Sequence, residues 1–209
     1  MKKTPLAILK EKERKARQKL IVNSAERLFA AKPFPKVSIR DIADESGISL
    51  SSIYRYFPDQ ESLFIEALTR GAKKVHLLLD KVIKDEGAGV EDMANTFVEF
   101  LIKNDSYFRM MTHFMLDGAL NTSSVDKLNQ IERALLDQFN TFFSRLNPDG
   151  SHRITAHAFF ASLNGILITY RNYPGRDIKD VHKHMKQLAS VLASMFALML
   201  SSGNNLVSK

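Results

Sequence analysis

Apolar residues recur every three to four positions along most of this 209-residue chain, which is the spacing that lines one face of an α-helix. After Pro58 the spacing occurs in six segments, and none shows the strict alternation typical of a β-strand. The six segments are residues 59–84, 90–104, 106–117, 124–146, 151–170 and 178–201. With three helices expected before them, the pattern predicts an all-α fold of about nine helices.

The first predicted helix covers residues 10–31. Leu20, Ser24 and Leu28 share one face of it, and Phe29 widens that face. Pro33 follows directly and ends the helix, because proline cannot donate a backbone hydrogen bond.

Residues 38–57 predict two short helices joined by a tight turn. Ser38 with Asp41 three positions later resembles a capping box, which begins a helix reaching about residue 45. Gly47 supplies the left-handed conformation that the turn needs. Ser49 is placed to cap a second helix that reaches residue 56 or 57. Such a pair is a helix-turn-helix.

The two short helices have an inner apolar face and an outer polar one. The residues expected inside are Ile39, Ile42, Ala43, Ile48, Ile53 and Phe57. Those left on or near the outer face of the second helix are Leu50, Ser51, Ser52, Tyr54, Arg55 and Tyr56. Small polar residues followed by Tyr and Arg suit the major groove of DNA, where the start of a reading helix approaches base edges. The sequence therefore predicts DNA contact through this helix.

Positive charge is concentrated near the N-terminus. Residues 1–60 carry 13 Lys and Arg against 7 Asp and Glu, so +6 of the net charge of +7 lies there. A basic segment beside a near-neutral body suits a phosphate backbone, and a solvated basic tail is the plainer alternative. An acidic membrane surface is a remote third possibility for residues 2–19, but it leaves the helix-turn-helix pattern unexplained.

Several classes of protein are disfavoured by composition. The chain has no cysteine, so it has no disulfide or thiolate metal site. The apolar stretches at residues 6–9 and 188–200 are too short for a signal peptide or a membrane span. His182 and His184 lie two positions apart and point to different helix faces, and no catalytic motif is present. We expect a cytoplasmic protein that is not an enzyme and has no metal, cofactor or membrane partner.

The run from Ser38 to Leu63, SIRDIADESGISLSSIYRYFPDQESL, resembles the DNA-binding signature of the TetR (tetracycline-repressor-like) family. Gly47, the residues 53–57 and the residues 61–63 carry most of the match. The resemblance implies a transcriptional regulator, by family habit a repressor, that binds a palindromic operator as a homodimer. It also implies a helical regulatory domain whose ligand changes the spacing between the two DNA-binding domains of the dimer.

Carried over position by position, the resemblance implies roles for seven residues. Ser38, Tyr54 and Tyr56 are expected at phosphates, and Leu50, Ser51, Ser52 and Arg55 where bases are contacted. Arg55 is the best candidate for reading guanine, with a phosphate contact left open. Gln60 stands where the family often has Lys, and the basic segment at residues 2–19 is expected to offset that loss along the backbone or in the minor groove.

The predicted organisation has three parts. Residues 1–14 form a basic extension, residues 15–60 the helix-turn-helix domain, and residues 61–209 an effector-binding and dimerisation domain. A dimer is expected through residues 151–170 and 178–200, with core packing inside one protomer as the alternative. The apolar seam expected there is Ile178, Val181, Met185, Leu188, Leu192, Met195 and Met199. Stripes of small residues accompany it at Ala189, Ala193 and Ala197 and at Ala158, Ser162, Gly165 and Thr169.

The middle helices are rich in Phe and Met, which suit either a core or an apolar pocket with a few polar anchors. The predicted pocket residues are Phe97, Phe100, Leu101, Met110, Met111, His113, Phe114, Phe139, Asn164 and Tyr170. The expected effector is a hydrophobic small molecule. A regulator with no such effector, acting constitutively or through a protein partner, is the alternative left open.

Overall fold

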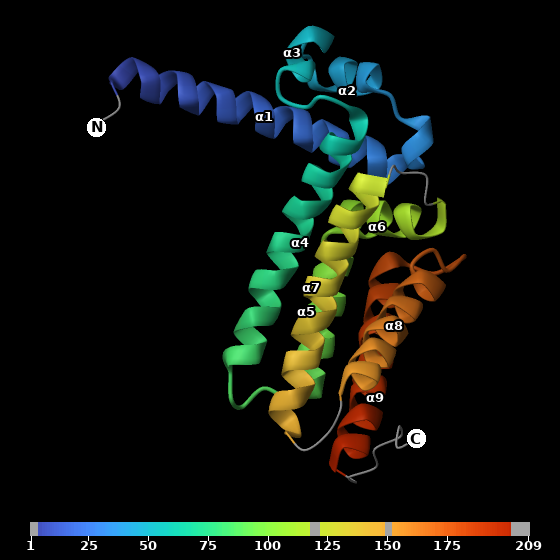
Figure 1. The fold of residues 1–209 in the computed structure, drawn as a ribbon. Coiled ribbons are helices and arrows are strands. Elements are labelled where there is room, and N and C mark those ends of the chain that lie inside the picture. The colour runs from blue at the N-terminus through green and yellow to red at the C-terminus, as the bar shows by residue number, and fades with distance from the viewer. Residues whose placement is uncertain (1–3, 118–121, 149–151, 202–209) are drawn as a thin grey trace. The chain divides into compact units, whose positions relative to one another are not determined.

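The computed structural model describes residues 4–117, 122–148 and 152–201, and Figure 1 shows their arrangement. Within these residues there are nine α-helices, one short 3₁₀ helix and no strand, which confirms the predicted all-α fold. The elements are α1 (Pro5–Ala31), η1 (Phe34–Lys36), α2 (Ile39–Ser46), α3 (Leu50–Tyr54), α4 (Gln60–Lys84), α5 (Val90–Lys103), α6 (Asp105–Asp117), α7 (Thr122–Leu146), α8 (Arg153–Tyr170) and α9 (Ile178–Ser201).

Helix α1 begins five residues earlier than the sequence pattern predicted. The Thr4 hydroxyl accepts a hydrogen bond from the backbone N–H of Ala7, and Pro5 occupies the first helical position, where its missing N–H costs nothing. The predicted basic extension is therefore helical from Pro5 onward and continuous with the rest of α1.

Helices α2 and α3 form as predicted at the turn and differ at their ends. The capping box of Ser38 and Asp41 is present, and Gly47 has a left-handed φ of 65°. Helix α3 ends at Tyr54, earlier than predicted, and the chain continues as a turn toward Phe57, the residue before Pro58.

The chain divides into two compact units that do not follow its order. The first contains Met1–Gly71 and Asn104–Leu128, and the second contains Ala72–Lys103 and Asn129–Lys209. Helix α6 belongs to the first unit because it packs along α1. The functional division predicted after residue 60 is a different one and remains a prediction.

An aromatic cluster lies in the core of the first unit. Phe29 of α1, Phe34 of η1 and Phe64 of α4 have ring centroids 5.0 to 5.7 Å apart. Phe29 and Phe64 are fully buried, whereas Leu20, which was predicted on the same helix face as Leu28, is exposed. The core of α1 therefore begins only at Ile21, and the helix before it is open to solvent.

The second unit is also built on edge-to-face phenylalanines. Phe97 of α5 lies 5.3 Å from Phe139 of α7 and 5.5 Å from Phe160 of α8, measured between ring centroids. Helix α9 packs on α5 through a face that includes Ala189 and Ala193, both buried. The small side chains of α9 therefore serve close packing within this chain.

Gly71 on α4 marks a close approach between two helices of the first unit. A Cβ atom at this position would overlap the ring of the buried Tyr107 on α6. The overlapping atoms include the Cγ of Tyr107, which does not move when the ring rotates about the Cβ–Cγ bond. That rotation therefore cannot relieve the clash.

We predict that Gly71→Ala lowers the free energy of unfolding by about 1 to 3 kcal/mol, because overpacking outweighs the gain in helix propensity. Urea unfolding followed by circular dichroism measures this. Gly87→Ala, in an exposed loop where the added methyl meets only ordinary contact, is the matched control and should be nearly neutral. Equal stability of the two variants would contradict the prediction.

Candidate functional site

The surface of α3 is the first candidate site, and its inner side is anchored as predicted. Ile39, Ile42 and Ala43 of α2 are buried, as are Ile53 and Phe57. Ile48 in the turn is half-buried. These contacts fix which residues of α3 face outward.

The six residues predicted on the outer side of α3 all retain exposed surface. Ser51, Tyr54 and Arg55 are exposed, and Leu50, Ser52 and Tyr56 are half-buried. Because α3 ends at Tyr54, Arg55 is its C-cap and Tyr56 follows the helix. The structure thus brings the predicted residues together on one short segment, with Arg55 at its far end.

The start of α3 carries a network of hydroxyl groups. The Ser49 Oγ lies 2.9 Å from that of Ser52 and 3.3 Å from that of Ser51. The Arg55 guanidinium donates to the Ser52 Oγ at 3.0 Å. The prediction that Ser49 caps the backbone is wrong, because its hydroxyl is engaged by these side chains. Such rotatable donors and acceptors are of the kind that contacts base edges.

Ser38 has a structural role in the protein. Its backbone N–H and its hydroxyl each donate to an Asp41 carboxylate oxygen at 2.7 Å, and these bonds hold the pKa of Asp41 below its usual value. The Ser38 hydroxyl also accepts from the Asp41 N–H at 3.1 Å. Any phosphate contact by Ser38 therefore competes with the cap of α2.

Gln60 is likewise engaged within the fold. Its side-chain amide donates to the backbone carbonyl oxygen of Phe34 at 2.8 Å. At the same helix start, the Asp59 carboxylate accepts from the backbone N–H of Ser62 at 2.7 Å, which lowers the Asp59 pKa. Gln60 thus ties η1 to α4, a role that the sequence comparison with Lys did not foresee.

A basic groove lies between α1 and the end of α3. Its volume is about 380 Å³, and it is lined by Lys10, Glu13, Arg14, Arg17, Arg55 and Tyr56. This surface shared by the basic N-terminal residues and the α3 residues was not predicted from the sequence, where the two groups lie far apart. The spacing of positions 10, 13, 14 and 17 along one helix face was the signal available.

The predicted ligand residues do not form one cluster. Phe97, Phe100, Leu101, Phe139, Asn164 and Tyr170 belong to the second unit, whereas Met110, Met111, His113 and Phe114 lie on α6 in the first. The side chain of Phe114 lies outside the described ones. His113 is half-buried, with its Nδ1 3.2 Å from the carbonyl oxygen of Phe29. That contact belongs to the packing of α6 on α1.

Most of the second unit's predicted ligand residues are core side chains. Phe97, Phe100, Leu101 and Phe139 are buried in the aromatic cluster described above or beside it. Asn164 is also buried; its amide donates to the Phe160 carbonyl oxygen at 2.9 Å, while its Oδ1 has no hydrogen-bond partner among the described residues. A buried acceptor without a partner is costly, which makes Asn164 a candidate polar anchor.

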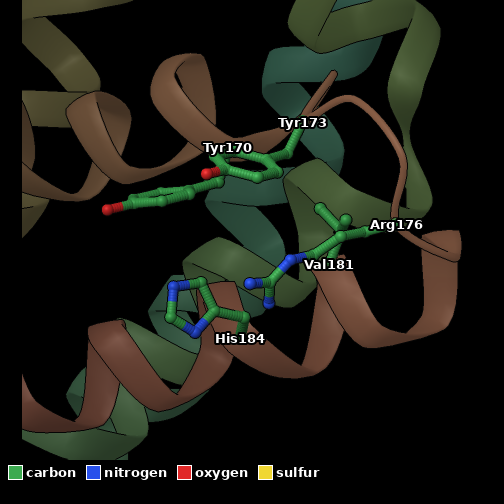
Figure 2. A pocket seen from close by; sticks show the side chains of 5 residues that line it. All are labelled: Tyr170, Tyr173, Arg176, Val181 and His184. Atoms are coloured by element: carbon green, nitrogen blue, oxygen red, sulfur yellow. The ribbon is translucent and has the colours of Figure 1, made fainter.

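Tyr170 is the predicted ligand residue that lines an open pocket, shown in Figure 2. The pocket has a volume of about 250 Å³ and is lined by Tyr170, Tyr173, Arg176, Val181 and His184. The two tyrosine rings stack with centroids 6.1 Å apart, and Arg176 lies over the Tyr173 ring. Nearby, burial and the charges of Arg171 and Lys186 lower the pKa of His182.

The outer faces of α8 and α9 expose many apolar residues. Ile154, Ile168, Val191, Met195 and Leu198 are each more than half exposed. The predicted α9 seam is divided, since Val181 and Met185 are buried within the chain while Ile178 and Met195 are exposed. The small-residue stripe of α8 is open to solvent at Ala158, Gly165 and Thr169, and a Cβ on Gly165 would meet nothing within 4 Å.

Among the residues that the structure describes, no group of three or more His, Asp and Glu residues is arranged to hold a metal ion. None of the described helices is long and apolar enough to span a membrane.

Comparison with known sequences places the match at the helix-turn-helix. The family model described as "Bacterial regulatory proteins, tetR family" matches residues 21–67. An uncharacterised HTH-type transcriptional regulator of Haemophilus influenzae is 32% identical over 108 residues, which are 50% of this chain and 51% of that protein. The match to this curated relative thus spans about half of its length.

Solved structures resemble the whole fold. A transcriptional regulator of the TerR/AcrR family from Aquifex aeolicus VF5 has a TM-score of 0.68 at 16% identity, covering 84% of this chain and 99% of its own. A putative transcriptional regulator from Pseudomonas aeruginosa PAO1 has a TM-score of 0.70 at 15% identity, covering 91% and 95%. At these identities the likeness concerns the fold.

Proposed function

We propose that this chain, whose residues 21–67 match the family model of the TetR family of bacterial regulatory proteins, is a cytoplasmic transcriptional repressor of that family. In this proposal a homodimer binds a palindromic operator and is released by a hydrophobic small molecule. The observation that carries the proposal is the exposed polar face of α3, held outward by the buried Ile53 and Phe57. Family membership also agrees with the expectation that the chain is not an enzyme.

In this proposal α3 enters the major groove. Leu50, Ser51 and Ser52 lie at its start and face base edges, where the leucine offers an apolar contact to a thymine methyl group. Tyr54 and Tyr56 contact phosphates on either side. Ser38 adds a phosphate contact only if the α2 cap rearranges, and Arg55 contacts DNA from the end of α3.

The proposed dimer uses the outer faces of α8 and α9. Two such helices from each protomer would form a four-helix interface that covers the exposed Ile168, Val191, Met195 and Leu198. The open stripe at Ala158 and Gly165 permits close helix approach. An apolar face of this kind is otherwise rare on a monomer.

The proposed effector site is in the second unit. Tyr170 already lines a pocket, and the unpaired Oδ1 of Asn164 would gain a partner from a ligand donor. Helix α4 contains residues of both compact units, because the division falls between Gly71 and Ala72. A ligand changes the position of the helix-turn-helix only if it binds two arrangements of α4 with different affinity.

We predict that genome fragments selected by the purified protein share a palindrome, which anisotropy titration shows to be bound by a dimer. Ser51→Ala should reduce the preference for one base pair in each half-site by about five- to tenfold, as expected for loss of about 1 kcal/mol of base contact. Ser144→Ala, at an exposed position of α7, is the control and should bind as the wild type does. Weak binding without sequence preference would refute the proposal.

We predict that Gly165→Leu keeps the protomer folded and weakens dimerisation thirtyfold or more. The leucine meets open space within the protomer, but a symmetric interface carries the clash twice, at about 1 to 3 kcal/mol each. Analytical ultracentrifugation measures this, with Ser144→Leu on exposed α7 as the control. A Gly165→Leu dimer of unchanged affinity would place the interface elsewhere.

We predict that a panel of apolar acids, amines and aromatic alcohols contains compounds that release labelled operator. Tyr170→Ala and Asn164→Leu should each raise the concentration needed at least tenfold, because polar anchors are lost. Leu77→Ala, at an exposed position of α4, should leave it unchanged. Failure of the whole panel would favour a regulator that works constitutively or through a protein partner.

A further inference from the structure

The N-terminal half of α1 buries little of its surface against the rest of the protein. From Pro5 to Leu20 every residue is exposed except the half-buried Glu11 and Gln18. At 1.5 Å per residue this half is about 24 Å long. Figure 1 shows it extending beyond α2 and α3 of the same unit.

The residues of this half-helix do little to stabilise it. Its apolar side chains at Leu6, Ile8, Leu9 and Leu20 are exposed and contribute little buried area. Two ion pairs four residues apart, Glu11 with Lys15 and Glu13 with Arg17, satisfy its two carboxylates. Pairs of this kind contribute only about 0.3 to 0.5 kcal/mol each. A polar, isolated helix of this length is marginal in water.

Four cations of the half-helix are left over once these pairs are counted. Lys10, Lys12, Arg14 and Lys19 have no ion pair among the described residues. Lys10 and Arg14 share a face with Glu13 and Arg17, and that face lines the basic groove with Arg55 and Tyr56. Lys12 and Lys19 lie on the opposite face, at the same helical spacing.

The groove is strongly electropositive. Its charged lining residues are four cations and the carboxylate of Glu13, which Arg17 already engages at 2.6 Å. Guanidinium groups bind phosphate oxygens in a two-pronged geometry, and the Tyr56 hydroxyl is a further donor of the type found at phosphates. The groove therefore suits a phosphodiester backbone.

We propose that this groove holds backbone phosphates of the same duplex whose major groove receives α3, so that the exposed half of α1 is a second DNA-binding element. This inference rests on the proposed function. It also assigns Arg55 to phosphate: the side chain is the C-cap of α3, is held back by Ser52 and faces the cations of α1. Base reading then falls to the serines and Leu50 at the start of α3.

An acidic membrane surface fits these observations less well. A helix that lies in a membrane interface separates an apolar face from a basic one. Here cations stand on both faces, and the groove joins α1 to the residues that follow α3. Phosphates regularly spaced along a rigid duplex match a groove between two fixed elements.

The test compares two double variants of the full chain on the selected operator duplex. Lys10→Gln with Arg14→Gln removes two groove charges, and Lys12→Gln with Lys19→Gln removes two from the opposite face. The groove variant should bind at least tenfold more weakly near 0.15 M salt, and its salt slope should fall by about two per protomer, at roughly 0.9 per phosphate. Base preference should be unchanged, and the opposite-face variant should lose less than about threefold.

Two further measurements test the same surface. Trimming the duplex outside the palindrome should weaken the wild type and leave the groove variant nearly unaffected, because the flanking phosphates are what the groove binds. Arg55→Gln should lower the salt slope by about one per protomer without changing base preference. Backbone amides of residues 5–20 should exchange rapidly in the free protein and slowly on the long duplex.

The outcomes separate this inference from the function on which it rests. If the wild type binds no duplex selectively, the proposed function itself fails. If it binds selectively and the two double variants lose affinity equally, or Arg55→Gln changes base preference, the groove assignment is wrong. Binding to phosphatidylserine vesicles at 0.15 M salt that depends on Lys10 and Arg14, with operator binding unchanged, would assign the groove to membranes instead.

Discussion

The packing of Phe29, Phe34 and Phe64 is the contact on which the position of the helix-turn-helix, α2 and α3, depends. It joins α1, η1 and α4 around one buried point, and the hydrogen bond from Gln60 to the Phe34 carbonyl oxygen adds a polar tie beside it. Helix α3 has only five residues, too few to be stable alone. Its orientation is therefore determined by its packing on α2 and by the helices that this aromatic cluster holds together.

Sequence reasoning succeeded where local chemistry determines structure. The capping box at Ser38 and the left-handed Gly47 are dictated by residues a few positions apart, and the six later helices matched their predicted segments to within a few residues. It failed where several hydrogen-bond partners compete or where tertiary packing decides which positions are buried. Ser49 stands at a cap position, yet its hydroxyl contacts those of Ser51 and Ser52, and Leu20 fits the helical pattern but is exposed.

The same limit explains why only part of the apolar seam predicted on α9 is exposed. A repeat of three and four residues identifies apolar positions without saying which of them face the core of the chain itself. In α9, burial follows Val181, Met185, Ala189 and Ala193, a row set by packing against α5. The groove at Arg55 was not predicted for a related reason. Residues 10–17 and 55–56 are far apart in the sequence, and only the tertiary fold brings them together.

The division of the fold has a consequence for how such proteins exchange parts. Helix α6 packs on α1, although Ala72–Lys103 of the second unit lie between the two segments of the first unit in the sequence. A recombination event that replaced only the first sixty residues would bring a foreign α1 against the resident α6, including the contact between Phe29 and His113. Under the proposed function, a change of DNA-sequence preference therefore requires fewer compensating substitutions when it arises within α3 than when the whole N-terminal module is exchanged.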